Sequence, residues 1–476
     1  MQRLRGTDAQ AIYYETYASP FVTLKALIYE QVDPADPVGA DELKQAIVRG
    51  VGKVGYHGAA MRVMRVPLDI HHPVWIQDPD FDIDEHIYHI GLPAPGRKAQ
   101  LCDFISQLMG MPLDHNRPLW ETWILEGLEG GRIALVSRVH HALADGMTAA
   151  SDIVTVHSRP ESPEPVQHDW IAAAEPVPSR LKLAAVSLVD LFRAYLIDFP
   201  KFYDHLRKAR LAARDLKDSE TPVTRPFEGP YTFLNKCGSV YRVYRYETFP
   251  LNDIKSLARR LDCTINTLVL GICSEALRRY FIDFDELPEK PLVVSMPVGV
   301  GGKVDELSLF DTDIHNNSLA LSLVRLDLNI ADFRERLQDI GSSATAALEH
   351  LRKTEGRRFD NFFDFMPGTF VRLLSNWLDG RVAKKESPYA NTVISNVAGP
   401  RETLFHCGGR LRATELLSCG NIADPTALNI TVWSYVDKIT FSFLYRKGIF
   451  SHPDQLNQYV TDVVGELSET YLAQCS

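Results

Sequence analysis

The sequence predicts an α/β protein built from two regions that each mix strands and helices. The chain has 476 residues. Because one hydrophobic core rarely serves more than about 250–300 residues, a chain of this length is expected to form two or three units. Strand-like and helix-like segments occur on both sides of residues 157–180, and that stretch carries five prolines. Proline at this density breaks helices and sheets, so the stretch is predicted to be a linker.

These observations divide the chain into an N-terminal region at 1–158, a linker and helix at 159–225, and a C-terminal region at 226–476. Alternating or continuous apolar residues are typical of half-buried or buried strands. They predict strands at 132–142, 291–300, 318–328, 391–400, 427–436 and 438–446. Apolar residues at helical spacing predict a helix over 264–281, with Thr264 as its N-terminal cap.

Residues 180–217 predict an amphipathic helix that Pro200 ends or kinks. Its apolar stripe consists of Leu181, Ala185, Leu188, Phe192, Tyr195 and Phe199. The segment holds nine Lys and Arg residues against four Asp and Glu residues, so it is locally positive. Two interpretations are open. The stripe packs against the body of the protein, or it lies on a membrane or lipid droplet, where its cations meet anionic headgroups.

Composition limits the class of protein. Hydrophobic residues make up 45 % and charged residues 24 % of the chain, a globular profile. The net charge of −10 argues against nucleic acid as a partner, since phosphate contact needs a basic face. Seven scattered cysteines without a C-x-x-C pair indicate free thiols in a reducing compartment. With no membrane-spanning run and no signal peptide apparent, we expect a cytoplasmic protein, with peripheral binding to the inner membrane or lipid inclusions left open.

The segment "RVHHALADGM" (138–147) is the strongest candidate for chemistry. Side chains alternate along a strand, so His140 and His141 point to opposite faces, and we expect one to be chemical and the other to support it. Asp145 is expected to brace the following turn, and Gly146 permits a positive φ or a close backbone approach there. Adjacent histidines on a strand splay apart, and no companion ligand with suitable spacing lies nearby, so we expect no metal.

Residues 111–149, "MPLDHNRPLWETWILEGLEGGRIALVSRVHHALADGMTA", resemble the heart of the bacterial wax ester synthase/diacylglycerol acyltransferases (WS/DGAT). The segment at 74–96 is similar to the N-terminal region of that family. "NTVISNVAGP" and "ALNITVWSYVDKITFSFL" resemble its C-terminal strands. The HH-x-x-x-DG pattern alone is shared with peptide-synthetase condensation domains, whereas the PLW and SNVAGP segments favour WS/DGAT.

The resemblance implies two chloramphenicol-acetyltransferase-like subdomains with mixed sheets flanked by helices, joined by the linker and helix and meeting at a central substrate tunnel. It also implies esterification of a long-chain alcohol or diacylglycerol by acyl-CoA, which acts as co-substrate, with no further cofactor. By position, His141 is the implied general base and His140 its supporting neighbour, while Asp145 and Gly146 shape the loop. The PLW motif, implied to shape the tunnel, is Pro118, Leu119 and Trp120.

Two features depart from the family pattern. Asn266 is a candidate donor to the tetrahedral oxyanion or, alternatively, a helix cap, and Thr267 follows it where the family usually has Asp. Residues 295–303 lack the arginine that the family commonly has, which leaves the contacts to the CoA phosphates open. The alternatives to a CoA-dependent O-acyltransferase are a condensation-type enzyme with a carrier-bound acyl donor and a catalytically degenerate lipid-binding protein.

Overall fold

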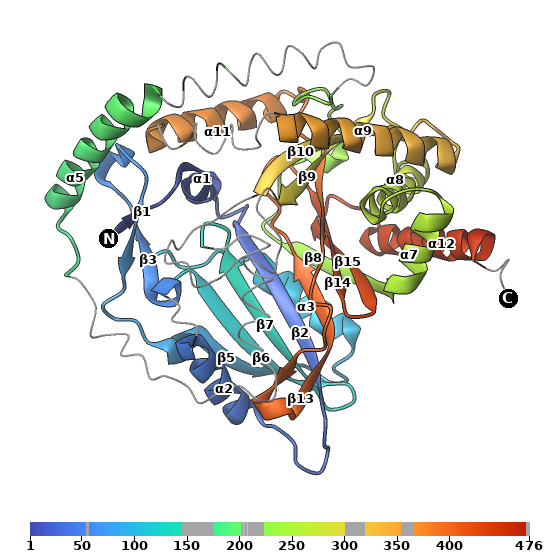
Figure 1. The fold of residues 1–476 in the computed structure, drawn as a ribbon, viewed down its shortest axis with the longest axis horizontal. Helices are drawn as coiled ribbons and strands as arrows, with labels where there is room; N and C mark the ends of the chain where they lie inside the picture. The colour runs from blue at the N-terminus through green and yellow to red at the C-terminus, as the bar shows by residue number, and fades with distance from the viewer. Residues whose placement is uncertain are drawn as a thin grey trace.

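The fold combines two large mixed β-sheets with helices packed against them, as Figure 1 shows. A computed structural model describes residues 1–53, 57–143, 176–200, 203, 207, 223–299, 319–353, 363 and 366–472. Within these ranges each large sheet has six strands, and each contains both parallel and antiparallel pairs. The predicted α/β class with mixed sheets is therefore confirmed. The central tunnel stays a prediction.

The histidine pair lies where one of the inner strands of the first sheet ends. Its order is β12 (Phe405–His406), β13 (Leu411–Cys419), β2 (Val22–Gln31), β7 (Arg132–His140), β6 (Trp120–Leu128) and β5 (Ile87–Gly91). Two strands from the C-terminal part of the chain thus complete the sheet of the N-terminal part. The predicted ranges 1–158, 159–225 and 226–476 divide the chain in sequence order. The first sheet contains strands from both the predicted N-terminal region and the predicted C-terminal region.

The second sheet contains five of the predicted strands. Its order is β10 (Leu319–Leu326), β9 (Leu292–Gly299), β11 (Thr392–Val397), β14 (Leu428–Tyr435), β15 (Lys438–Arg446) and β8 (Arg242–Pro250). The helices of this half are α7 (Leu251–Arg260), α8 (Ile265–Phe284), α9 (Phe333–Lys353) and α12 (Pro453–Tyr471). The predicted helix over 264–281 is confirmed as α8, and the Thr264 hydroxyl accepts a hydrogen bond from the Thr267 N–H at 3.1 Å, as expected of a cap.

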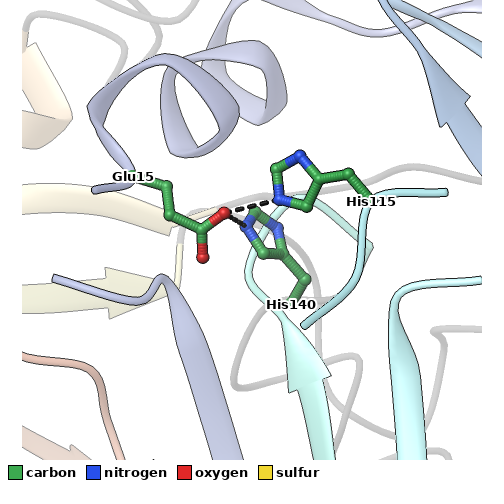
Figure 2. Close-up of side chains that lie close together, drawn as sticks. All are labelled: Glu15, His115 and His140. Carbon is green, nitrogen blue, oxygen red and sulfur yellow. Dashed lines mark hydrogen bonds and ion pairs between the residues drawn. The ribbon is translucent and has the colours of Figure 1, made fainter. Parts of the chain in front are cut away.

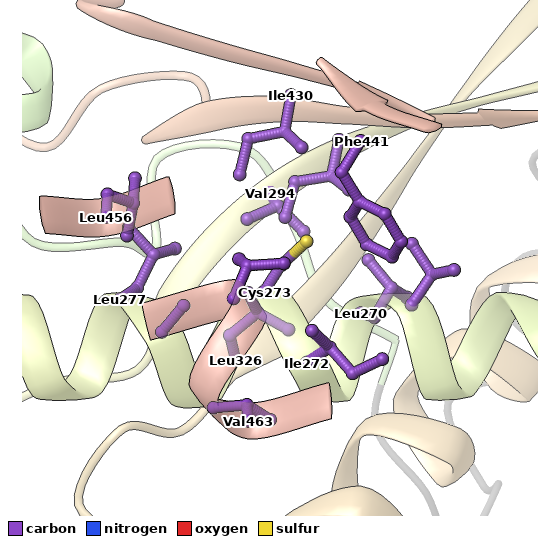
Figure 3. Close-up of a cluster of buried hydrophobic side chains, with 14 of the residues drawn as sticks. Leu270, Ile272, Cys273, Leu277, Val294, Leu326, Ile430, Phe441, Leu456 and Val463 are labelled. Carbon is purple, nitrogen blue, oxygen red and sulfur yellow. The ribbon is translucent and has the colours of Figure 1, made fainter. Parts of the chain in front are cut away.

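The core of the second half lies between this sheet and helices α8 and α12, as Figure 3 shows. Cys273 and Leu277 of α8 pack between strand side chains such as Phe441 and the α12 side chains Leu456 and Val463. Each buried Leu or Phe contributes roughly 1.5–3 kcal/mol of transfer free energy. The apolar pattern of α8 therefore fixes this helix, and with it the position of its first turn.

The remaining elements lie outside the two large sheets. The small sheet comprises β1 (Gln2–Arg3), β4 (Val74–Gln77) and β3 (Met61–Met64). The helices are α1 (Gly6–Tyr14), α2 (Ala40–Lys53), α3 (Lys98–Met109), α5 (Arg180–Arg193) and α11 (Gly368–Ala383). Short turns are η1 (His57–Ala60), η2 (Pro67–Asp69), η3 (Ile83–His86), η4 (Ala194–Asp198), η5 (Phe233–Asn235) and η7 (Cys407–Gly409). In the part of the chain described, no helix has the length and apolarity to cross a membrane.

Helix α5 departs from one sequence-based interpretation. The predicted apolar stripe lies on its outer side, where Leu181 is 85 % and Phe192 is 67 % exposed. The interpretation in which this stripe packs against the body is therefore wrong. Pro200 does not end the helical conformation abruptly. The π-helical turn η4 precedes it, because a proline has no N–H for the carbonyl one turn earlier.

Candidate active site

The site begins where strand β7 ends. His140 is the last residue of the strand and is fully buried, while His141 is the first residue of the following turn and is half-buried. The His140 N–H donates to the Leu119 carbonyl at 2.9 Å, and the His141 N–H donates to the Phe21 carbonyl at 2.7 Å. Backbone from both neighbouring strand ends therefore fixes the histidine pair.

The ring of His140 shapes the turn that carries His141. Its Nδ1 accepts a hydrogen bond from the Ala142 N–H at 3.0 Å, and the Leu143 N–H donates to the His140 carbonyl at 2.9 Å. An imidazole nitrogen that accepts from an N–H carries no proton. The hydrogen-bond pattern thus assigns the proton of the neutral ring to Nε2. The His140 ring therefore positions Ala142, and with it the turn in which His141 lies.

Glu15 lies directly after α1, and its carboxylate points at the rings of His115 and His140, as Figure 2 shows. Its Oε2 is 2.5 Å from His115 Nε2 and 3.4 Å from His140 Nε2, the latter an ion-pair distance without hydrogen-bond alignment. Its other oxygen, Oε1, accepts a hydrogen bond from the Phe21 N–H at 3.0 Å. The carboxylate therefore contacts the His140 ring, which shapes the turn that carries His141. It also contacts Phe21, whose carbonyl accepts the His141 N–H.

Burial and charge fix the protonation states of this cluster. Burial alone would raise the pKa of Glu15, but the adjacent imidazoles of His115 and His140 outweigh it and hold that pKa well below its ordinary value. Burial lowers the pKa of His140 despite the nearby carboxylate. Near pH 7 the Glu15 carboxylate is therefore ionised and the His140 ring is neutral.

The same three side chains are the candidate metal ligands of the described ranges. The ligand atoms of Glu15, His115 and His140 lie within 4.8 Å of one another. Two imidazoles and a carboxylate form a donor set that zinc accepts. Here the short contact between Glu15 and His115 and the Nε2 proton of His140 already use the inward-facing atoms. The expectation of no metal stays a prediction.

The remaining predicted residues are the Asp-Gly pair, the PLW motif and Asn266. Asp145 and Gly146 lie outside the described residues. Pro118, Leu119 and Trp120 are buried, and the Trp120 indole N–H donates to the Ala59 carbonyl at 2.8 Å. Leu119 and Trp120 belong to the hydrophobic core of the first half, and the Leu119 carbonyl anchors the His140 N–H. The role of the PLW motif in a tunnel remains a prediction.

Asn266 lies in the first turn of α8, where its Nδ2 is 3.0 Å from the sulfur of Met296 on β9. Thr264 caps this helix, so the interpretation of Asn266 as the cap is wrong. The Thr267 hydroxyl is 2.9 Å from that of Thr264 and joins the cap. The role of Asn266 as an oxyanion donor is left as a prediction.

Sequence reasoning missed Glu15 and His115. His115 lies within the quoted PLDHNRPLW segment, and Glu15 within "AIYYETYASPF" (11–21). No spacing rule joins Glu15 to a histidine 125 residues further along the chain (140 − 15). The available signal was the lone carboxylate in an apolar, aromatic segment, because a buried charge needs a partner.

A surface cleft lies at the opposite end of β7, beside Arg132. Its cations Arg97, Lys98 and Arg132 all pair with glutamates. The nine residues of β7 place Arg132 roughly 26 Å from His140 at the rise of an extended strand. This cleft is therefore separate from the histidine site.

Comparison with known proteins identifies the family. Residues 4–269 match the wax ester synthase/diacylglycerol acyltransferase catalytic domain, and residues 315–468 match the WS/DGAT C-terminal domain. The chain belongs to the WS/DGAT family. It is therefore an acyltransferase of WS/DGAT type, and the resemblance found in the sequence is confirmed. The catalytic-domain match includes Glu15, His115, His140 and His141.

Relatives in this family span most of the chain. A Mycobacterium tuberculosis protein, provisionally named a diacylglycerol O-acyltransferase, is 31 % identical over 463 residues, covering 96 % of this chain and 93 % of its own. The O-acyltransferase WSD of Acinetobacter baylyi is 30 % identical over 372 residues, covering 77 % of this chain and 76 % of its own.

Solved structures support the fold. The wax ester synthase/diacylglycerol acyltransferase of Marinobacter aquaeolei VT8 aligns with a TM-score of 0.63 at 22 % identity, over 99 % of this chain and 100 % of its own. The first condensation domain of the CDA synthetase aligns at 0.57 and 14 % identity, over 98 % and 93 %. At these identities the likeness concerns the fold alone.

Proposed function

We propose that the protein transfers an acyl group from acyl-CoA to the hydroxyl of a long-chain alcohol or diacylglycerol, with His141 as the general base. The observation that carries this proposal is the bridge made by Glu15. Through Oε1 it reaches Phe21, whose carbonyl accepts the His141 N–H, and through Oε2 it faces the ring of His140. A positioned base must be held rigidly, and this bridge fixes the backbone on both sides of His141.

The chemistry suits a neutral imidazole. An alcohol holds its proton far too tightly at pH 7 to ionise unaided, so the proton must leave as the oxygen attacks the thioester carbonyl carbon. The His141 ring takes that proton, and a tetrahedral oxyanion forms. The oxyanion then collapses, the carbon–sulfur bond breaks, and the imidazolium returns the proton to the CoA thiolate. A positioned base of this kind contributes about 10²–10⁴ in rate.

His140 has a different role in this proposal. Its ring is fully buried and neutral, and both of its nitrogens face protein groups, Ala142 N and Glu15 Oε2. It therefore positions the turn rather than contacting substrate. Asp145 and Gly146 are proposed to complete the loop, Asn266 to donate to the oxyanion, and Pro118, Leu119 and Trp120 to shape the substrate channel.

The proposed partners are acyl-CoA and the lipid acceptor, with no resident cofactor or metal. Because the acceptors dissolve in lipid, we place the protein in the cytoplasm, at the inner membrane or at lipid inclusions. The relatives from Mycobacterium tuberculosis and Acinetobacter baylyi support acyl transfer to oxygen through their names.

A substrate panel tests the proposal. The purified full chain is given palmitoyl-CoA with hexadecanol, with a diacylglycerol, or with no acceptor, and both CoA release and ester are measured. Acceptor-dependent CoA release with one ester formed per CoA supports the proposal. A protein that transfers acyl groups only from a phosphopantetheine carrier supports the condensation-type alternative and overturns it. Lipid binding without turnover overturns it in favour of the degenerate lipid-binding protein.

A further inference from the structure

Helix α5 turns its apolar side away from the protein. Leu181, Leu188, Val189, Phe192 and Leu196 are 85 %, 55 %, 67 %, 67 % and 60 % exposed. At about 100° per residue these positions, which run from α5 into η4, share roughly one third of the helical circumference. A surface helix of a soluble protein normally directs such a stripe inward.

The opposite side of α5 is fixed to the body by polar contacts. Arg3 pairs with Asp190 at 2.7 Å, its guanidinium donates to the Ser187 hydroxyl at 3.0 Å, and it also donates to the His72 carbonyl at 2.7 Å. Leu183 is fully buried against Val66 and neighbouring side chains. These contacts hold α5 in the orientation that exposes its apolar side.

Two further elements extend the exposed apolar surface. Turn η2 contacts both α5 and α11, and its central residue Leu68 is 86 % exposed with a φ of 58°. On α11 the residues Phe370, Leu373 and Trp377 share one face and are 44 %, 66 % and 52 % exposed. Figure 1 shows α5 and α11 along the same edge of the molecule.

Positive charge borders this surface. Lys182 and Arg193 are exposed beside the apolar stripe of α5, and Lys384 and Lys385 are exposed directly after α11. The acidic residue of α5, Asp190, is neutralised by Arg3. The chain as a whole has a net charge of −10, so this basic border contrasts with the rest of the molecule.

We propose that this surface docks the protein on a phospholipid bilayer that contains anionic headgroups. We call it the docking face, and it is formed by Leu68, Leu181, Leu188, Val189, Phe192, Leu196, Phe370, Leu373 and Trp377. Apolar side chains enter the boundary between headgroups and acyl chains, while bordering cations meet the phosphates. A second copy of the chain would set two basic borders against each other, which disfavours self-association.

Bilayer docking rests in one part on the proposed function, because a lipid acceptor reaches the site from a bilayer more readily than from water. The exposure, the Arg3 contacts and the basic border are independent of it. The test therefore measures vesicle binding and catalysis separately.

The experiment is flotation of the full chain with vesicles of phosphatidylcholine, with and without phosphatidylglycerol. The test variant is Leu188→Ser with Phe192→Ser and Leu196→Ser. The control replaces Val32, Tyr241 and Ile282 with Ser, since these are comparably exposed apolar residues, at 54 %, 68 % and 50 %, outside the docking face. We expect at least about tenfold weaker vesicle binding for the test variant and wild-type binding for the control.

Charge and catalysis provide the remaining measurements. Lys182→Glu with Arg193→Glu should abolish the preference for phosphatidylglycerol vesicles. CoA release with a water-soluble alcohol such as hexanol should be unchanged in the docking-face variants, which separates lost docking from lost catalysis. Equal binding of wild type and test variant overturns the proposal, whatever the activity. A wild-type dimer that the test variant converts to monomer, measured by light scattering, also overturns it by assigning the face to a second copy.

Discussion

Replacing Glu15 with Gln removes the charge from the His141 support while keeping its shape. The carboxylate, which only accepts hydrogen bonds, becomes an amide with one oxygen and one NH₂ donor. With the oxygen on the Phe21 N–H, the NH₂ faces the Nε2 proton of His140 and the ring of His115. With the amide reversed, the NH₂ faces the Phe21 N–H. Either orientation sets donor against donor in a site where the Glu15 side chain is 7 % exposed.

The expected loss follows from these contacts. A hydrogen bond to a charged group contributes about 1.5–3 kcal/mol, and a buried unsatisfied donor costs a similar amount. If the misplacement of His141 raises the activation free energy by that amount, kcat falls about tenfold to 100-fold, since ~1.4 kcal/mol corresponds to a factor of ten. Glu15 contacts no substrate in the proposed mechanism, so KM should stay within about twofold of wild type.

The assay is steady-state CoA release with palmitoyl-CoA and hexadecanol. Its matched control is Glu126→Gln, because Glu126 also pairs with a histidine, His89, at 2.7 Å but on the surface. That variant should keep wild-type kinetics, since exposed pairs contribute little. Glu15→Asp keeps the charge on a shorter side chain and should recover part of the lost kcat. A Glu15→Gln enzyme with full kcat, or with a raised KM alone, would refute the positioning role.

Three further outcomes are expected. His140→Asn should keep more activity than His140→Ala, because the Asn Oδ1 can replace Nδ1 as acceptor for the Ala142 N–H; equal kcat values would contradict this. Asn266→Ala should lower kcat about 10²–10³-fold without changing the melting temperature, since Thr264 caps the helix; an unchanged kcat would remove Asn266 from the oxyanion site. Burial lowers the pKa of His406 to about 4. A depressed histidine pKa means that the unfolded chain binds protons first, so folding stability falls as pH drops below about 6.5, by about 2 kcal/mol near pH 5. In His406→Asn the amide oxygen can accept the Cys407 N–H but does not titrate. The free energy of unfolding in urea should therefore fall by about 2 kcal/mol less between pH 7 and pH 5 than in wild type. Equal losses in the two proteins would contradict this.

Local patterns predicted the elements well because they depend on neighbours in sequence. The alternation at 438–446 corresponds to β15 at Lys438–Arg446, and the pattern at 264–281 corresponds to α8. The strand predicted at 132–142 ends at His140, because the chain then turns and the Leu143 N–H donates back to the His140 carbonyl. The presence of a helix or strand follows from the periodicity of its apolar residues, whereas the residue at which it ends depends on tertiary hydrogen bonds.

Long-range arrangements were not accessible from the sequence. The pairing of β13 with β2 joins Cys419 to Leu24, and no local signal specifies such a partner. The same holds for Glu15, whose histidine partners lie 100 and 125 residues away in the chain. For α5, periodicity defined the apolar stripe but not the direction in which it points. The contacts of Arg3 with Asp190 and Ser187 decide that direction.

The most direct test of His141 as the general base is the rate of acyl transfer in His141→Ala, measured as CoA release under saturating palmitoyl-CoA and hexadecanol. We expect a kcat about 10²–10⁴-fold below wild type, with an unchanged melting temperature because the half-buried ring supports catalysis rather than the fold. A folded His141→Ala protein that turns over at the wild-type rate would contradict the assignment of this imidazole as the base.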